Sequence, residues 1–118
     1  MVVKTIIWHN PKCSKSRQAL ELLIKGNVFP KIRLYLQEPP SKNEIREVLS
    51  ILKLNAIDIV RKKEPEYKSL NPYIQTNEEL LIEILTKNPI LIERPIVIQG
   101  KKALIARPPS LIKSLIEG

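Results

Sequence analysis

The sequence of 118 residues contains a single cysteine, Cys13, so no disulfide can form within the chain. The N-terminal stretch has one Lys and an apolar run that is too short for a secretory signal peptide. No stretch approaches the roughly 20 apolar residues that a membrane-spanning helix needs. Because an exposed thiol is best kept in a reducing compartment, we expect a cytoplasmic protein.

Aromatic residues are also scarce, at 4% of the chain, whereas 43% of it is hydrophobic. The core must therefore be built mainly from Ile, Leu and Val, and the length fits one domain over residues 1–118. Acidic residues are few, and the formal net charge is +8. This charge suits an anionic ligand, nucleic acid or a membrane surface. Since the basic residues are dispersed and no aromatic residues alternate with them, a stacking surface for single-stranded nucleic acid is not expected. We therefore expect no nucleic-acid partner, and the lack of a long apolar stretch predicts no membrane partner.

The one cysteine lies in a polar, basic stretch at residues 9–17, His-Asn-Pro-Lys-Cys-Ser-Lys-Ser-Arg. Residues 2–8 before it are apolar and β-branched, which predicts a buried strand. Residues 18–25 after it are good helix formers. Pro11 blocks continuation of the strand, so the chain must turn into a helix at about Cys13. The sequence therefore places the thiol at the N-terminus of a helix.

That position makes the thiol a candidate nucleophile. Unpaired N–H groups and the positive end of the helix dipole stabilise a thiolate, which is the reactive form of cysteine. Lys12, Lys15 and Arg17 add positive charge, and the same N–H groups can hold an oxyanion. The alternative is a small buried hydrophobic residue, but the polar neighbours favour a reactive thiol. His9 is as consistent with a hydrogen-bonded structural residue as with a catalytic one.

The rest of the chain predicts an α/β fold. Gly26 ends the first helix, and residues 31–36 alternate as in a half-buried second strand. A right-handed crossover then makes the first two strands parallel. Residues 95–99 and 103–106 flank a short glycine turn, which predicts a β-hairpin that adds antiparallel strands to the same sheet. This is the layout of a thioredoxin-like domain with a four-stranded mixed sheet and flanking helices.

Helical patterns fill the stretch between the second strand and the hairpin. Ser41 and Glu44 have the spacing of a capping box, and so do Thr76 and Glu79. The patterns predict helices over 41–53, 55–61 and 76–88, an exposed polar segment over 62–68, and a last helix that begins at 108–110.

Three motifs resemble the signatures of the arsenate reductase family that couples to glutathione and glutaredoxin. The first is His-Asn-Pro-x-Cys-x-x-Ser-Arg at residues 9–17, the second lies at 88–97, and the third is Ala-Arg-Pro at 106–108. They occur in the family's order and span nearly the whole chain. The resemblance implies a thioredoxin-like fold, and the helices between second strand and hairpin match that family's helical insertion.

The resemblance also implies roles for individual residues. An arginine guanidinium binds an oxyanion through two parallel hydrogen bonds, and nearby positive charge favours a thiolate. Pro95 would be the cis-proline that faces the cysteine in thioredoxin-like folds, and His9 would help to lower the thiol pKa. Ser16 would bond the sulfur or the anion, or else cap the helix. The implied set is the catalytic residues Cys13 and His9, the substrate-binding residues Arg61, Arg94, Arg107 and Ser16, and Pro95 near the site.

The implied mechanism uses external thiols. The thiolate attacks the arsenic of arsenate, glutathione attacks the arsenylated cysteine, and glutaredoxin completes reduction to arsenite. Because Cys13-x-x-Ser16 offers no second cysteine, no internal thiol can resolve the intermediate. We expect a monomer with no bound cofactor or metal, with glutathione as co-substrate and glutaredoxin as partner.

One departure from the family pattern and two rival functions remain to be considered. Ser14 and Lys15 stand where reductases proven in arsenic resistance more often have Gly-Thr, so the chain resembles a sister branch whose substrate can differ. One alternative is a monothiol redox protein of glutaredoxin type that acts on glutathione mixed disulfides, although it would not need three arginines. The other is a non-enzymatic regulator that binds RNA polymerase. That branch commonly carries Cys-x-x-Cys, which this chain lacks.

Overall fold

The computed structural model describes residues 4–117, and the chain divides into two compact units. The sheet unit comprises the residues up to Tyr35 and those from Arg94 onward. The helical unit comprises residues 36–93, the stretch predicted as a helical insertion. The single domain over residues 1–118 stays a prediction. Within residues 4–117, no helix is long and apolar enough to traverse a bilayer.

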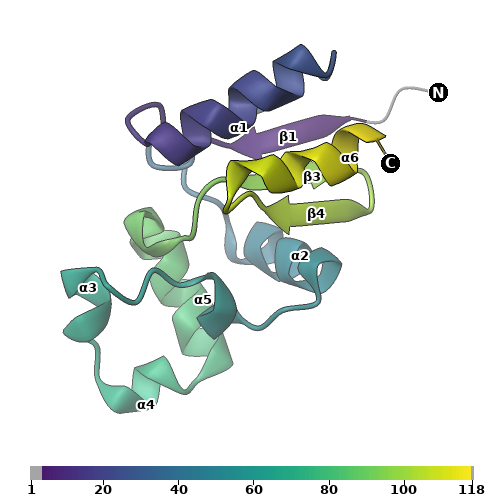
Figure 1. Cartoon of the computed structure of the whole chain (residues 1–118). Helices are drawn as coiled ribbons and strands as arrows, with labels where there is room; N and C mark the ends of the chain where they lie inside the picture. The colour runs from purple at the N-terminus through teal and green to yellow at the C-terminus, as the bar shows by residue number, and fades with distance from the viewer. Residues whose placement is uncertain (1–3, 118) are drawn as a thin grey trace. The chain divides into compact units, whose positions relative to one another are not determined.

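The described part of the sheet unit contains one mixed sheet of four strands in the order β2-β1-β3-β4 (Figure 1). The first two strands pair in parallel, and the other neighbouring pairs are antiparallel. This arrangement confirms the predicted mixed sheet. The strands are β1 (Thr5–Trp8), β2 (Lys31–Arg33), β3 (Ile96–Gln99) and β4 (Lys102–Ile105).

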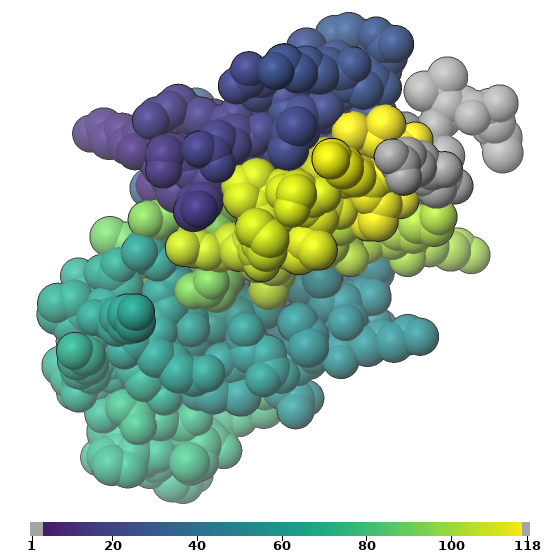
Figure 2. All heavy atoms as spheres, viewed as in Figure 1, coloured from purple at the N-terminus to yellow at the C-terminus, as the bar shows by residue number. Residues whose placement is uncertain are grey.

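One face of this sheet forms the core of the unit. Ile7 and Val97 are register partners on β1 and β3, and both are fully buried. They form one apolar cluster with residues of α1 (Ser14–Lys25), the 3₁₀ helix η3 (Pro109–Ile112) and α6 (Lys113–Glu117). Figure 2 shows the C-terminal segment, in yellow, lying against the dark blue atoms of α1. The cluster holds the start of α1 in a fixed position relative to the sheet.

The second strand is shorter than the predicted range of residues 31–36. It is an edge strand whose sheet partner is β1, and β1 ends at Trp8 opposite Arg33. The His9 N–H closes this pairing by donating to the Arg33 carbonyl at 2.8 Å. Since β1 offers no strand residue beyond that point, the chain turns, and Tyr35 becomes almost fully buried.

The other predictions for the sheet unit differ from the structure by a residue or two. The first strand is confirmed over Thr5–Trp8, and residues 2 and 3 of its predicted range lie outside the described residues. The hairpin is confirmed with its turn at Gly100, whose φ of 60° is readily adopted by glycine. The last helix begins as a 3₁₀ turn before it becomes α6.

The helical unit is organised around α5 (Glu78–Lys87), which packs against α2, α4, η1 and η2. Its apolar side is buried, with Leu81, Ile82 and Leu85 at 2% exposure or less. Of the predicted helix over residues 55–61, only Ala56–Ile59 is helical, as a 3₁₀ helix, and the polar segment 62–68 contains a short helix that was not predicted. The remaining elements are α2 (Lys42–Leu52), η1 (Ala56–Ile59), α3 (Pro65–Lys68), α4 (Pro72–Gln75) and η2 (Pro89–Leu91).

One of the two predicted capping boxes is confirmed and the other is wrong. The Glu44 N–H donates to Ser41 Oγ at 3.1 Å, and the Ser41 N–H donates to Glu44 Oε1 at 2.9 Å. At α5 the cap is Asn77, whose Oδ1 accepts from the Leu80 N–H at 3.0 Å. The Thr76 hydroxyl instead donates back to carbonyls of α4, because α4 ends where the box was predicted to begin.

Candidate functional site

Cys13 is the N-cap residue of α1, as the sequence predicted. Residues 11 and 12 form a turn, and the Cys13 N–H closes it by donating to the Asn10 carbonyl at 2.9 Å. The Cys13 carbonyl accepts from the Arg17 N–H at 3.0 Å and so starts the helix. The N-cap position places the thiol at the positive end of the helix. Because Cys13 is only half-buried, the residue also stays accessible to solvent.

The surroundings of the sulfur favour the thiolate. Partial burial raises the pKa of the Cys13 thiol, but a hydrogen bond from Arg94 and the N–H of Ser16 lower it. The charge of Arg94 and the N–H of Lys15 lower this pKa further. The net result is a pKa below the ordinary value, which leaves a larger fraction of thiolate at neutral pH.

Arg94 reaches Cys13 from the start of β3. The Arg94–Pro95 peptide bond is cis, as predicted, and Pro95 is buried. The Arg107 Nη1 donates to the Arg94 carbonyl oxygen at 3.3 Å, and the Arg107–Pro108 bond is also cis. The sheet unit therefore brings Cys13, Arg94 and Arg107 together, with Arg107 against the main chain of Arg94.

His9 and Ser16 are both buried, and they lie on either side of the turn at residues 11 and 12 in the sequence. The His9 Nδ1 lies 2.6 Å from the Ser16 Oγ, which also accepts from the Asn10 N–H at 3.0 Å. Burial and then the charge of Arg17 lower the pKa of His9, so its imidazole is neutral at pH 7. A neutral imidazole adds no positive charge to stabilise the thiolate. The structure shows His9 bonded to the hydroxyl that links Asn10 to α1, and its predicted part in lowering the thiol pKa stays a prediction.

Arg61 belongs to the helical unit and is engaged there. Its Nη1 lies 2.8 Å from Glu64 Oε1, and both side chains are about one-fifth exposed. The same nitrogen donates to the Ile90 carbonyl at 3.5 Å. An anion that uses Arg61 must therefore compete with the Glu64 carboxylate, and the substrate-binding role of Arg61 stays a prediction.

Tyr35 is a residue that the sequence analysis missed. It is 1% exposed and interacts with the Arg94 guanidinium. Burial lowers the pKa of Arg94, but its interactions with Cys13 and then with Tyr35 raise it, so the guanidinium stays charged beside the sulfur. The sequence did offer a signal for Tyr35: it lies in residues 31–36, where polar and apolar residues alternate. A tyrosine that is buried in such a segment needs a partner for its hydroxyl.

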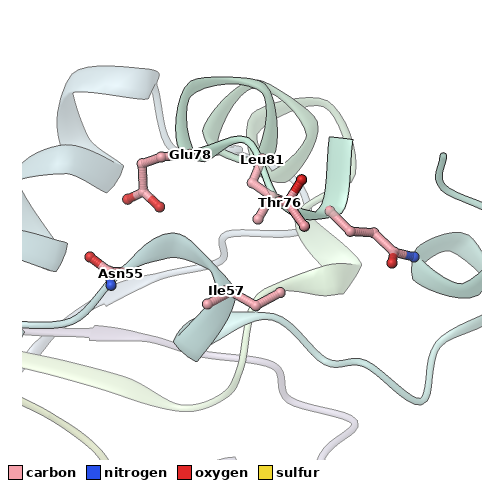
Figure 3. A pocket seen from close by; sticks show the side chains of 6 residues that line it. Asn55, Ile57, Thr76, Glu78 and Leu81 are labelled. Carbon is pink, nitrogen blue, oxygen red and sulfur yellow. The ribbon is translucent and has the colours of Figure 1, made fainter. Parts of the chain in front are cut away.

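A pocket of about 490 Å³ lies wholly within the helical unit. In Figure 3 the side chains of Asn55 and Glu78 face one another at one end of it. The Glu78 carboxylate accepts from the Ala56 N–H at 3.0 and 3.1 Å, and the Gln75 amide donates to two carbonyls. These groups serve the unit's own packing, so the pocket adds nothing to the thiol site. Among residues 4–117, no group of three His, Cys, Asp or Glu side chains could hold a metal ion.

Comparisons with known proteins identify the family to which the chain is similar. The model of the ArsC family matches residues 8–115. "Uncharacterized protein YfgD" of Escherichia coli K12 is 42% identical over 118 residues, covering 98% of this chain and 99% of the relative. A Haemophilus influenzae protein named arsenate reductase is 40% identical over 116 residues, covering 97% and 100%. The structure of a Vibrio cholerae arsenate reductase superposes with a TM-score of 0.90 at 37% identity, covering 97% and 98%, which confirms the predicted fold.

Proposed function

This chain belongs to the ArsC family, and from that premise we propose that it is an oxidoreductase that reduces arsenate to arsenite at Cys13. Relatives from Haemophilus influenzae and Neisseria meningitidis, at 40% and 36% identity, carry the name arsenate reductase. The observation that carries the proposal is the Arg94 guanidinium hydrogen-bonded to the Cys13 sulfur. This pair offers a nucleophile and an oxyanion-binding group at one point.

The first step is attack of the Cys13 thiolate on arsenic. A sulfur–arsenic bond forms and an arsenate oxygen leaves as hydroxide. Arg94 and the N–H groups of Lys15 and Ser16, which stabilise the thiolate, remain to hold the oxygens of the arsenylated cysteine. Arg107 and Arg61 complete the proposed set of anion-binding arginines, and for Arg61 this requires release from Glu64.

The second step uses an external thiol. Because the chain has one cysteine, glutathione supplies the thiolate that attacks the arsenylated Cys13. A disulfide forms between the glutathione sulfur and the Cys13 sulfur, and the sulfur–arsenic bond breaks with its electron pair left on arsenic. Arsenic(V) thereby becomes arsenic(III) and leaves as arsenite. Glutaredoxin then reduces the disulfide that remains and regenerates the thiol. We place the protein in the cytoplasm as a monomer, where a glutathione pool keeps the thiol reduced.

A reductase assay with arsenate, glutathione and glutaredoxin tests the proposal. We expect wild-type turnover, no turnover by Cys13→Ser, and a loss of at least about 100-fold for Arg94→Gln. Arg46→Gln is the matched arginine control, since Arg46 pairs with Glu79 on the helical unit. Failure of the wild type to reduce arsenate, or full activity of Cys13→Ser, would overturn the proposal. Reduction of a glutathionylated peptide without response to arsenate would instead support the glutaredoxin-type alternative.

A further inference from the structure

The two units of the chain differ sharply in charge. The sheet unit holds 12 of the 20 Lys and Arg residues but only 2 of the 12 Asp and Glu residues. The helical unit holds the other 8 basic and 10 acidic residues, so the formal charges are +10 and −2. The whole net charge of +8 therefore arises on the unit that carries Cys13.

Three of these cations lie close to Cys13 along the chain: Lys12 is in the turn before it, and Lys15 and Arg17 are in the first turn of α1. Lys12, Lys15 and Arg17 are exposed, and they lie one, two and four residues from Cys13. Arg17 is fixed over the loop, because its Nη1 donates to the Pro11 carbonyl at 2.8 Å. The Lys12 N–H donates to an Asn10 side chain at 3.0 Å, which holds the turn in place.

No acidic side chain offsets these three cations within residues 4–20. Glu21 is the first acidic residue of the chain, and its carboxylate is 3.3 Å from the Lys25 ammonium. An anion that approaches Cys13 therefore meets positive charge from the loop and from the start of α1. Such a single-sign field raises the local concentration of anions and their rate of encounter.

A matched pair of lysines lies at the opposite end of the sheet. Thr5 pairs with Gln99, so the hairpin turn that contains Lys101 lies beside the start of β1, and Lys102 follows it. Cys13 instead follows the end of β1. Both lysines are exposed, and they contribute to the same total charge without lying near the thiol.

We propose that Lys12, Lys15 and Arg17 select negatively charged reactants for Cys13 over neutral ones by long-range attraction. The identity of those reactants rests on the proposed function: they are the oxyanion and the thiol that regenerates the cysteine. The regenerating thiol then carries net negative charge, whether it is a small molecule or an acidic protein face. The selection acts through the three charged side chains, whereas Lys15 contributes to the proposed anion binding only through its backbone N–H.

Alkylation of the single cysteine measures this selection directly. Iodoacetate is an anion and iodoacetamide is neutral; each forms a sulfur–carbon bond with the thiolate and releases iodide. Because both reagents need the thiolate, the ratio of their rate constants cancels any change in the thiol pKa. We expect the wild-type ratio in 10 mM salt to exceed that of N-acetylcysteine amide severalfold. At 1 M NaCl the Debye length is about 3 Å, so the wild-type ratio should fall to that of N-acetylcysteine amide, the model thiol.

Two double variants separate local from total charge. Two unit charges about 10 Å apart in water change an encounter rate roughly twofold, so Lys12→Gln/Lys15→Gln should lower the ratio about fourfold at low salt. Lys101→Gln/Lys102→Gln removes the same charge and should lower it less than about twofold. The inference is overturned by a wild-type ratio no higher than that of the model thiol, by a ratio insensitive to salt, or by equal losses in both variants. Since no arm uses arsenate, failure of arsenate reduction would overturn the proposed function alone.

Discussion

The Nδ1 of His9 lies 2.6 Å from the Oγ of Ser16, at the point where the residues after β1 meet the first turn of α1. Both residues are buried, with 6% and 0% exposure. The Asn10 N–H donates to the same hydroxyl oxygen. One hydroxyl therefore connects the strand end, the loop and the helix, and it fixes the backbone that presents Cys13.

Ser16→Ala should destabilise the protein. It removes the shared hydroxyl and leaves the buried His9 ring nitrogen and the partly buried Asn10 N–H without their partner. We expect a loss of about 1–3 kcal/mol in the free energy of unfolding, measured by urea denaturation. Ser14→Ala is the control, because Ser14 is exposed, and it should change the free energy by less than about 0.5 kcal/mol. Equal effects of the two substitutions would contradict the structural role of Ser16.

Stability should fall in mild acid because of His9. Burial lowers its pKa in the folded state, while the unfolded value is about 6.5. Between the two pKa values the unfolded chain binds more protons, so the free energy of unfolding rises with pH in that window. The contribution is complete above about pH 6.5 and is lost as the pH falls toward the folded pKa.

Urea denaturation in steps from pH 5 to 8 measures this dependence. Since His9 is the only histidine, a His9→Gln variant should flatten the slope. A Cys13→Ser background removes the thiol's own titration from the comparison. An unchanged slope in His9→Gln would show that another group titrates in this range.

The sequence predicted the elements of this site better than their contacts. Pro11 and the change from strand to helix pattern were enough to place Cys13 at the start of α1, because both are local signals. The contact of Arg94 with Cys13 depends on the register of β3 against β1, and Arg107 reaches Arg94 only because β4 pairs with β3. Such long-range pairing leaves no local signal, so only the resemblance to a family indicated these arginines.

The surroundings of Thr76 and His9 could not be predicted from the spacing of residues in the sequence. Thr76 and Glu79 satisfy the capping pattern, but the unpredicted helix α4 ends at Gln75 and uses the Thr76 hydroxyl. For His9, spacing does not report the burial that lowers its pKa. In both cases the residue type was identified correctly, and the tertiary neighbour decided its role.

Arg94→Gln should raise the pKa of the Cys13 thiol. The guanidinium donates a hydrogen bond to the sulfur and adds a positive charge, and both lower this pKa. Thiolate absorbance near 240 nm, followed against pH, gives the value from the chain's single cysteine. Arg61→Gln is the comparison variant: its guanidinium pairs with Glu64, so it should leave the thiol pKa unchanged even if it raises the KM for arsenate. Equal shifts in both variants would contradict the assignment of Arg94 as the partner of the thiolate.

Asn77→Ala should cost about 1 kcal/mol in the free energy of unfolding, because Asn77 caps α5 through the Leu80 N–H. Glu79→Ala tests the rejected capping box, because glutamine could still complete such a box: the Glu79 side chain pairs with Arg46 on the surface, so its removal should cost much less than Asn77→Ala. Thermal or urea unfolding of both variants gives the comparison. A loss of stability for Glu79→Ala as large as that for Asn77→Ala would support the capping box predicted from the sequence.

Gly26→Ala should destabilise the packing of α6 on α1. Gly26 caps α1 with a φ of −86°, a conformation open to alanine, so the backbone alone would favour the substitution by up to about 1 kcal/mol. An added Cβ, however, would lie 2.6–2.9 Å from three side-chain carbons of Ile116. We expect this overlap to outweigh the backbone gain, for a net loss of about 1–2 kcal/mol in urea denaturation. In an Ile116→Ala background the overlap disappears, and Gly26→Ala should become neutral or stabilising. If Gly26→Ala stabilised the otherwise unchanged chain, the close approach of Ile116 to Gly26 would be refuted.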